Sequence, residues 1–195
     1  MNPKYSFSFK KGDGKNKALL GGKGANLCEM TQMGLNVPPG FVITTATCLQ
    51  YLENKQLPAD LMAEVRQQIA EIEQETGKHF GGSSDPLLVS VRSGSAISMP
   101  GMMDTILNLG LNQQTLSAMI EMTDDPRFAY DAYRRFIQLF GKVALGIEDE
   151  KFDFHFENVK RAAGIKADVA LTAEQLQEIA DLFLMVVHEE TGKPF

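Results

Sequence analysis

The chain reads LLVSVR at residues 87–92, and this stretch is the clearest candidate for a buried β-strand. Its apolar residues run almost without interruption, which is typical of a strand that is covered on both faces. Residues 93–104 follow as SGSAISMPGMMD, which has no clear period and is rich in small residues and methionine. We therefore predict an α+β chain, with a mixed α/β part at residues 1–111 and a helical subdomain at residues 112–195.

The part before this strand alternates short strands with helices. Aromatic and polar side chains alternate over residues 5–9, which is the period of a strand. Two glycine-rich or proline-rich breaks separate the further elements that we predict: a helix at 25–33 ended by Gly34, a buried strand at 41–44, a helix capped by Thr45, and a helix after Pro58. That last helix has an apolar stripe of Leu61, Val65, Ile69 and Ile72, opposite a polar face of Glu64, Gln67, Gln68 and Glu71.

The part after the strand has helical periodicity from Asn112 onward. One predicted helix has a single apolar face, while its polar residues Arg134, Arg135, Gln138 and Lys142 point elsewhere. The apolar face consists of Ala129, Ala132, Phe136, Leu139, Phe140 and Val143. The acidic pair before Pro126 is interpreted as a helix cap rather than a metal site. Thr172 and Gln175 fit a capping box for the last helix, whose apolar stripe is Leu176, Ile179, Ala180, Phe183 and Val187.

Composition excludes several functional classes. Apolar residues make up 44% of the 195, so a core can form, and the net charge of -6 argues against a general nucleic-acid binder. No apolar run approaches the roughly 20 residues that a membrane-spanning helix needs. The two cysteines, Cys28 and Cys48, lie in apolar stretches, and we expect both to be buried free thiols in a cytoplasmic protein.

Lys23 lies among three glycines at a predicted helix start, in the sequence GGKG at residues 21–24. Unpaired amides at a helix start attract phosphate, glycines permit its close approach, and lysine adds a positive charge. The segment is not a Walker A loop, because Gly24 follows the lysine where that motif has serine or threonine. The alternative is a glycine-rich turn with a solvated lysine.

Arg92 follows the predicted strand directly, where ligands of α/β folds often bind, and a guanidinium can bind phosphate through two parallel hydrogen bonds. The alternative is an arginine paired with a carboxylate. The loop after it carries apolar methionines and several serines, so we predict either a flexible cover over a ligand or a loop packed under the helical part. The histidines His79, His155 and His188 are interpreted as surface or core-edge residues, and we predict no metal site.

Several stretches together resemble the phosphoenolpyruvate-utilising ATP-grasp enzymes, and the pyruvate, phosphate dikinase family in particular. They are GGKGANL at 21–27, VPPGF at 37–41, VRSG at 91–94, SMPGMMDT at 98–105, LNLG at 107–110 and PRFAYDAYRRF at 126–136. Phosphoenolpyruvate synthases share the Val-Arg-Ser start but continue with an acidic stretch, which the segment 99–104 does not match.

The resemblance implies an ATP-grasp-like first lobe in a nucleotide-binding domain that is incomplete here. It implies a cytoplasmic phosphotransferase that converts ATP, phosphate and pyruvate to AMP, pyrophosphate and phosphoenolpyruvate through a phosphohistidine on a separate domain. The residues that match the family's ATP-phosphate site and covering loop are Lys23, Arg92, Ser93, Gly94, Ser98, Gly101, Met102 and Met103. The resemblance implies that the Mg²⁺ ligands lie outside this chain and that its partners are the remaining dikinase domains. It also implies a homodimeric parent enzyme, and neither a nucleic acid nor a membrane as partner.

Two departures from the family pattern leave a second hypothesis open. The family commonly has an arginine between Gly94 and Ser98, where this chain has Ser95-Ala96-Ile97. The family pattern also continues past Phe195, so we expect no complete catalytic site in these residues. The alternative to an ATP-binding segment of a dikinase is a stand-alone relative that acts as a binding or regulatory module without catalysis.

Overall fold

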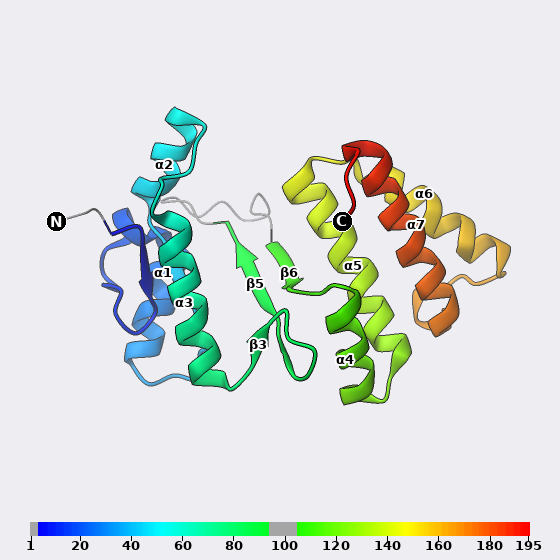
Figure 1. Cartoon of the computed structure of the whole chain (residues 1–195), viewed down its shortest axis with the longest axis horizontal. Coiled ribbons are helices and arrows are strands. Elements are labelled where there is room, and N and C mark those ends of the chain that lie inside the picture. The colour runs from blue at the N-terminus through cyan, green and yellow to red at the C-terminus, as the bar shows by residue number, and fades with distance from the viewer. Residues whose placement is uncertain (1–3, 94–104) are drawn as a thin grey trace. The chain divides into compact units, whose positions relative to one another are not determined.

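The computed structural model describes residues 4–93 and 105–195, which fall into two compact units (Figure 1). The first unit comprises residues 4–78 with Ser93, and the second comprises residues 79–92 and 105–195. In the described residues every strand precedes Asn112, and only helices and their connections follow it. The chain is therefore mixed α and β with small sheets, as the periodicity predicts.

The first unit contains two strands and three helices: β1 (Ser6–Ser8), α1 (Lys17–Gln32), β2 (Phe41–Ile43), α2 (Thr45–Asn54) and α3 (Leu61–Thr76). β1 and β2 pair antiparallel, with Phe7 opposite Val42. The small core of this unit consists of Leu20, Ala25 and Cys28, against which Phe7, Phe9, Leu19 and Val42 pack. The predicted strand at 41–44 is present as β2, which ends at Ile43, and its three residues are half-buried or exposed rather than buried.

Glu64 belongs to the packing of the first unit rather than to a solvated helix face. Its carboxylate accepts hydrogen bonds from the backbone amides of Tyr5 and Ser6 and from the hydroxyl of Ser6, at 3.1, 2.9 and 3.0 Å. Gln68, predicted on the same polar face, is also buried. The prediction was wrong for Glu64 and Gln68, because residues three and four positions apart share one side of a helix, which places both beside Leu61. This side of α3 contacts β1.

The cysteines and helix caps of the first unit differ partly from expectation. Cys28 is buried, and the pKa of its thiol is raised mainly by this burial and to a smaller extent by the nearby charge of Asp13. Cys48 is exposed, which corrects the prediction that both thiols are buried. The cap of α2 is Thr44, whose hydroxyl accepts a hydrogen bond from the Thr47 amide, so the predicted cap was one residue out.

The second unit begins with two short pairs of strands. β3 (His79–Phe80) pairs parallel with β4 (Pro86–Leu87), and β5 (Val89–Arg92) pairs antiparallel with β6 (Thr105–Leu109), with an irregularity between Val89 and Val91. The predicted buried strand at 87–91 is therefore two strands, and Val91 is 45% exposed. An apolar run alone does not show on which side a strand is covered, and this prediction was wrong in that respect.

The helices of the second unit are α4 (Gln113–Thr123), α5 (Pro126–Leu145), α6 (Asp149–Ala162), the short 3₁₀ helix η1 (Asp168–Ala170) and α7 (Ala173–Thr191). Asp125 caps α5 by accepting from the Phe128 amide at 2.9 Å, and Thr172 and Gln175 form the predicted capping box of α7. None of the helices in the described ranges is long and apolar enough to cross a lipid bilayer.

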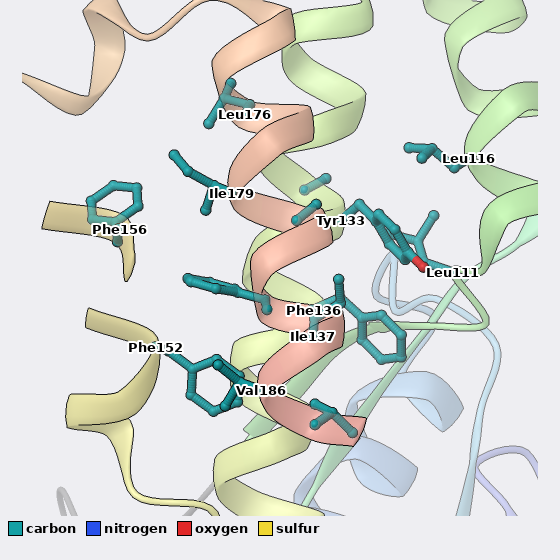
Figure 2. Packing of buried hydrophobic residues seen from close by; sticks show 14 of the residues in the cluster. Leu111, Leu116, Tyr133, Phe136, Ile137, Phe152, Phe156, Leu176, Ile179 and Val186 are labelled. Atoms are coloured by element: carbon teal, nitrogen blue, oxygen red, sulfur yellow. The ribbon is translucent and has the colours of Figure 1, made fainter. Parts of the chain in front are cut away.

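The large apolar core of the second unit lies where α5 packs against α7, α6 and β6 (Figure 2). Phe152 of α6 and Phe183 of α7 are fully buried and meet edge to face, with ring centroids 5.0 Å apart. α5 approaches α6 closely because Gly141 has no side chain: a Cβ there would lie 2.6 Å from the ring of Phe152. Burial of each such aromatic ring contributes about 1.5–3 kcal/mol.

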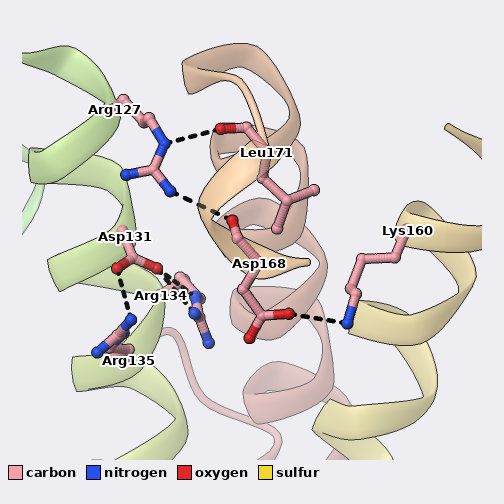
Figure 3. Close-up of polar contacts among 7 residues, drawn as sticks. All are labelled: Arg127, Asp131, Arg134, Arg135, Lys160, Asp168 and Leu171. Atoms are coloured by element: carbon pink, nitrogen blue, oxygen red, sulfur yellow. Dashed lines mark hydrogen bonds and ion pairs between the residues drawn. The ribbon is translucent and has the colours of Figure 1, made fainter. Parts of the chain in front are cut away.

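A polar network ties α5 to η1 and α6 (Figure 3). Asp131 accepts from Arg134 at 2.7 Å and from Arg135 at 2.8 Å, and the Arg134 guanidinium lies over the Phe156 ring. Arg134 is only 6% exposed, which corrects the prediction that it points away from the core. Its long apolar stem packs inside while its charge is paired.

The same network holds the segment between α6 and α7, which contains η1, against side chains of α5 and α6 (Figure 3). Arg127 donates to the backbone carbonyls of Leu171 and Asp168, at 2.9 and 3.2 Å. Lys160 lies 2.8 Å from the carboxylate of Asp168, and this hydrogen bond lowers the pKa of Asp168. The segment before α7 is thus bound through side chains of two helices.

We predict that Asp131→Ala destabilises the chain by about 3 kcal/mol, because it leaves the buried Arg134 charge without its partner. The matched control is Glu75→Ala, which breaks the exposed pair between Glu75 and Lys10 and is expected to cost under about 1 kcal/mol. Urea denaturation followed by circular dichroism measures both. Equal losses in the two variants would show that the burial of Arg134 does not determine the cost.

Candidate functional site

Lys23 lies just after a break in α1. The break is at Gly21, whose φ of 68° and ψ of 166° are not helical, so α1 consists of a short segment before Gly21 and a longer one from Gly22 to Gln32. Backbone of this kind is accessible essentially only to glycine. The predicted helix start at these glycines is therefore real, although a turn of helix also precedes it.

The break gives residues 22–24 the properties of a helix start. The first amides of a helical segment have no acceptor four residues earlier in the same segment, and they carry the positive end of the helix dipole. Lys23 is exposed at this point, and Gly22 on one side is half-buried. An anion at this place would meet amide hydrogens and an ammonium group together.

Gly24 has a packing role of its own. A Cβ at this position would lie 2.7 and 2.9 Å from the two methyl groups of Val42, so glycine lets α1 lie directly against β2. One glycine of the motif is thus required by the fold whether or not a ligand binds. Gly21 is required by its backbone conformation, and the packing of Val42 does not explain that conformation.

The positive charges near the break are free of ion pairs. Lys15, Lys17 and Lys23 are exposed and make no salt bridge with any residue in 4–93 or 105–195. Lys10 and Lys11, by contrast, pair with Glu75 and Glu71 of α3. Among the described residues, the lysines nearest to Gly21 in the sequence are therefore exposed and without a salt bridge, although the protein is acidic.

Arg92 is the last residue of β5, opposite Thr105 of β6, and it is exposed. It makes no salt bridge within the described part of the chain, so the alternative of an arginine paired with a carboxylate finds no support there. β5 and β6 are antiparallel. The tendency of ligands to bind at the carboxyl ends of parallel strands therefore does not explain a ligand at Arg92. β5 is supported by β6, whose Ile106 belongs to the large core of the second unit.

The other predicted site residues are mostly beyond the described ranges. Ser93 is described and exposed. Gly94, Ser98, Gly101, Met102 and Met103 lie outside the described residues, as does the rest of the predicted covering loop. Lys23 belongs to the first unit and Arg92 to the second.

Other features of the described residues do not offer a competing site of comparable chemistry. Two shallow depressions, of about 430 and 290 Å³, lie along α7 and between α6 and α7, and neither includes Lys23 or Arg92. Within the described ranges no group of three His, Cys, Asp or Glu side chains is arranged to hold a metal ion. His79 and His188 are exposed and His155 is half-buried against Phe154, as predicted for surface or core-edge residues.

Sequence reasoning missed one residue beside the break. Thr45 was assigned only a capping role, but its hydroxyl donates to the backbone carbonyl of Ala18, 2.5 Å away, in the turn of α1 that precedes Gly21. The two residues are 27 positions apart, and no local pattern marks such a pair. Only the packing of α2 beside α1 brings them together.

Comparison with known proteins adds an independent finding. The sequence profile of the family described as "Pyruvate phosphate dikinase, AMP/ATP-binding domain" matches residues 17–67 and 50–139, together more than half of the chain. The chain is 54% identical over 190 residues to pyruvate, phosphate dikinase of Entamoeba histolytica, covering 97% of the chain and 22% of that protein. It is 47% identical over 179 residues to the Giardia intestinalis dikinase and 44% identical over 187 residues to that of Clostridium symbiosum, covering 92% and 95% of the chain but 20% and 21% of those proteins. The chain thus spans about a fifth of the length of these relatives.

We predict that Gly21→Ala destabilises the first unit by about 1–3 kcal/mol, although alanine favours helices, because its Cβ is strained in this conformation. The control is Gly34→Ala, which also has positive φ (80°), lies just after the same helix, and has no atoms near its Cβ position. Both variants are expected to lose stability in urea denaturation, but only Gly21→Ala should shift the amide NMR resonances of residues 22–25. Unchanged resonances in Gly21→Ala would mean that glycine is not needed for the break.

Proposed function

The chain belongs to the pyruvate phosphate dikinase AMP/ATP-binding domain family, and from that premise we propose that it forms one wall of the ATP-phosphate site of a dikinase. The observation that carries this proposal is the break in α1 at Gly21, just before Lys23, which is exposed and makes no salt bridge with any described residue. The parent enzyme would convert ATP, phosphate and pyruvate to AMP, pyrophosphate and phosphoenolpyruvate. Its phosphohistidine would lie on a domain outside this chain.

The roles of the chain's own residues follow from their charge and exposure. Phosphoryl transfer depends mainly on positioning and on neutralising the charge of the phosphate oxygens. Lys23 would act as a point charge beside free amides, and Arg92 as a planar donor of two hydrogen bonds to one phosphate. Ser93, Gly94, Ser98, Gly101, Met102 and Met103 would form the loop that covers the phosphates.

The finer assignment of the fold is also part of this proposal. We assign an ATP-grasp-like first lobe to residues 1–111 and a helical subdomain to residues 112–195, within a nucleotide-binding domain that other residues of the parent enzyme would complete. The described residues do not fit Mg²⁺, since they contain no cluster of suitable ligands, and the proposal derives no step from a metal held by this chain. A cytoplasmic, homodimeric parent enzyme completes the proposal.

The second candidate function is a binding or regulatory module without catalysis. Ser95-Ala96-Ile97 favours it, because the dikinase family commonly has an arginine between Gly94 and Ser98. Lys23 and Arg92 favour the enzyme, because neither makes a salt bridge with a residue in 4–93 or 105–195. Dikinase assay of a longer version that includes the missing domains separates the two, since the module hypothesis requires no turnover.

We predict that Lys23→Ala and Arg92→Ala, made in such a longer version, each weaken ATP use at least tenfold, because both remove charged donors to phosphate. The fold should be unaffected, since both side chains are exposed and neither makes a salt bridge with a described residue. Turnover and circular dichroism are measured together, with Lys166→Ala, an exposed lysine of the second unit, as the control. Near-normal turnover in Arg92→Ala would remove Arg92 from the site.

We also predict that the 195-residue chain alone binds ATP with Mg²⁺ no more tightly than about the millimolar range, which corresponds to roughly 4 kcal/mol. One wall of a site leaves most of the nucleotide in water, where charge pairs are weak. Calorimetric titration tests this value. Micromolar binding would show that the site is complete within these residues.

A further inference from the structure

The carbonyl of Ala18 lies just before the break in α1. In an uninterrupted helix this oxygen would accept the amide of the residue four positions later, Gly22. Gly21, whose φ of 68° and ψ of 166° are not helical, lies between that donor and acceptor. A carbonyl at such a place needs another donor or must rely on water.

The donor comes from a different helix. The hydroxyl of Thr45, the first residue of α2, donates to the Ala18 carbonyl at 2.5 Å. We propose that Thr45 is a positioning residue for the ATP-phosphate site: it holds the break open from outside α1, so that the Gly22–Lys23 backbone keeps its free amides directed at the ligand.

Thr45 is suited to this role because the start of α2 is fixed by several buried contacts. Thr44 donates its amide to the carbonyl of Tyr5 at 2.9 Å, and the hydroxyls of Thr44 and Thr47 lie 2.8 Å apart. Both threonines are almost fully buried. Tyr5 is in turn held through its amide by the carboxylate of Glu64 on α3.

These contacts form a continuous path from Glu64 of α3 through Tyr5, just before β1, and the start of α2 to the break in α1. The path ends on the turn of α1 that precedes Lys23, and every bond in it lies within the first unit. The short first segment of α1 is additionally capped by Asn16, whose side chain accepts the Leu19 amide at 3.0 Å. The geometry at Lys23 is therefore set by α2 and α3 as well as by the glycines.

This inference rests on the proposed function, and the test keeps the two apart. The test variant is Thr45→Val, which keeps the shape of the side chain and removes the hydroxyl, and Thr45→Ser restores it. The control is Thr31→Val, which removes the same kind of bond, from a half-buried threonine hydroxyl to the Leu27 carbonyl at 2.8 Å, near the far end of α1. Lys23→Ala reports on the proposed function itself.

The measurement uses the 195-residue chain and follows the amide NMR resonances of residues 22–24 during titration with ATP and Mg²⁺ at millimolar concentration. We expect Thr45→Val to weaken binding about three- to tenfold and to shift the Gly22 and Lys23 resonances before any ligand is added. Thr45→Ser and Thr31→Val should stay within about twofold of the unmodified chain. Thermal unfolding of all variants is recorded beside the titration.

Two results would overturn the positioning role while the proposed function stands. One is unchanged binding in Thr45→Val when Lys23→Ala weakens it. The other is an equal loss in Thr45→Val and Thr31→Val, which would indicate general weakening of α1 rather than an effect at the break. If Lys23→Ala leaves binding unchanged, the phosphate site itself is refuted, and the role of Thr45 is refuted with it.

Discussion

The packing of α5 against α7, α6 and β6 is the interaction on which the second unit depends. The buried face of α5 contributes Ala129, Phe136 and Ile137 to the core, and Gly141 allows the ring of Phe152 to approach the helix backbone. The buried charge of Arg134 in this interface is paired with Asp131 and lies over the Phe156 ring. β6 lies on α5 and pairs with β5, so the position of Arg92 at the end of β5 follows from the same core.

The first unit depends less on apolar packing than the second, because its apolar core is small. Three buried side chains form its centre, and α2 buries only Thr47. Hydrogen bonds between distant segments therefore contribute a larger share of its order. The carboxylate of Glu64 accepts from the Ser6 amide at the start of β1, and the Tyr5 carbonyl accepts from the Thr47 hydroxyl of α2. The Thr45 hydroxyl donates to the Ala18 carbonyl in the turn of α1 before Gly21.

Both units present cations that their own folds leave unpaired. The chain is acidic overall, yet Lys15, Lys17, Lys23 and Arg92 make no salt bridge within the described residues. Unpaired charge is stabilised only by water until an anion arrives, and its presence at a helix start and at a strand end is what phosphate recognition requires. The chain belongs to a dikinase ATP-binding family and spans about a fifth of the length of its relatives, and we propose that Lys23 and Arg92 bind ATP phosphates.

The sequence by itself predicted the division into a mixed part and a helical part, much of the second-unit core, and the caps at Asp125 and Thr172. It did so because helical and strand periods, capping pairs and glycine motifs depend on residues that are close together in the chain. It did not predict the strands β3 and β6, and the roles of Lys23 and Arg92 stay predictions. The tertiary structure alone decided that Glu64 accepts hydrogen bonds from Tyr5 and Ser6, and that Arg134 is buried. It also decided that Cys48 and Val91 are exposed and that Thr45 donates to Ala18. In each of these cases a partner, or the lack of one, is set by packing between segments that are far apart, and local pattern carries no information about which distant segment comes to lie alongside.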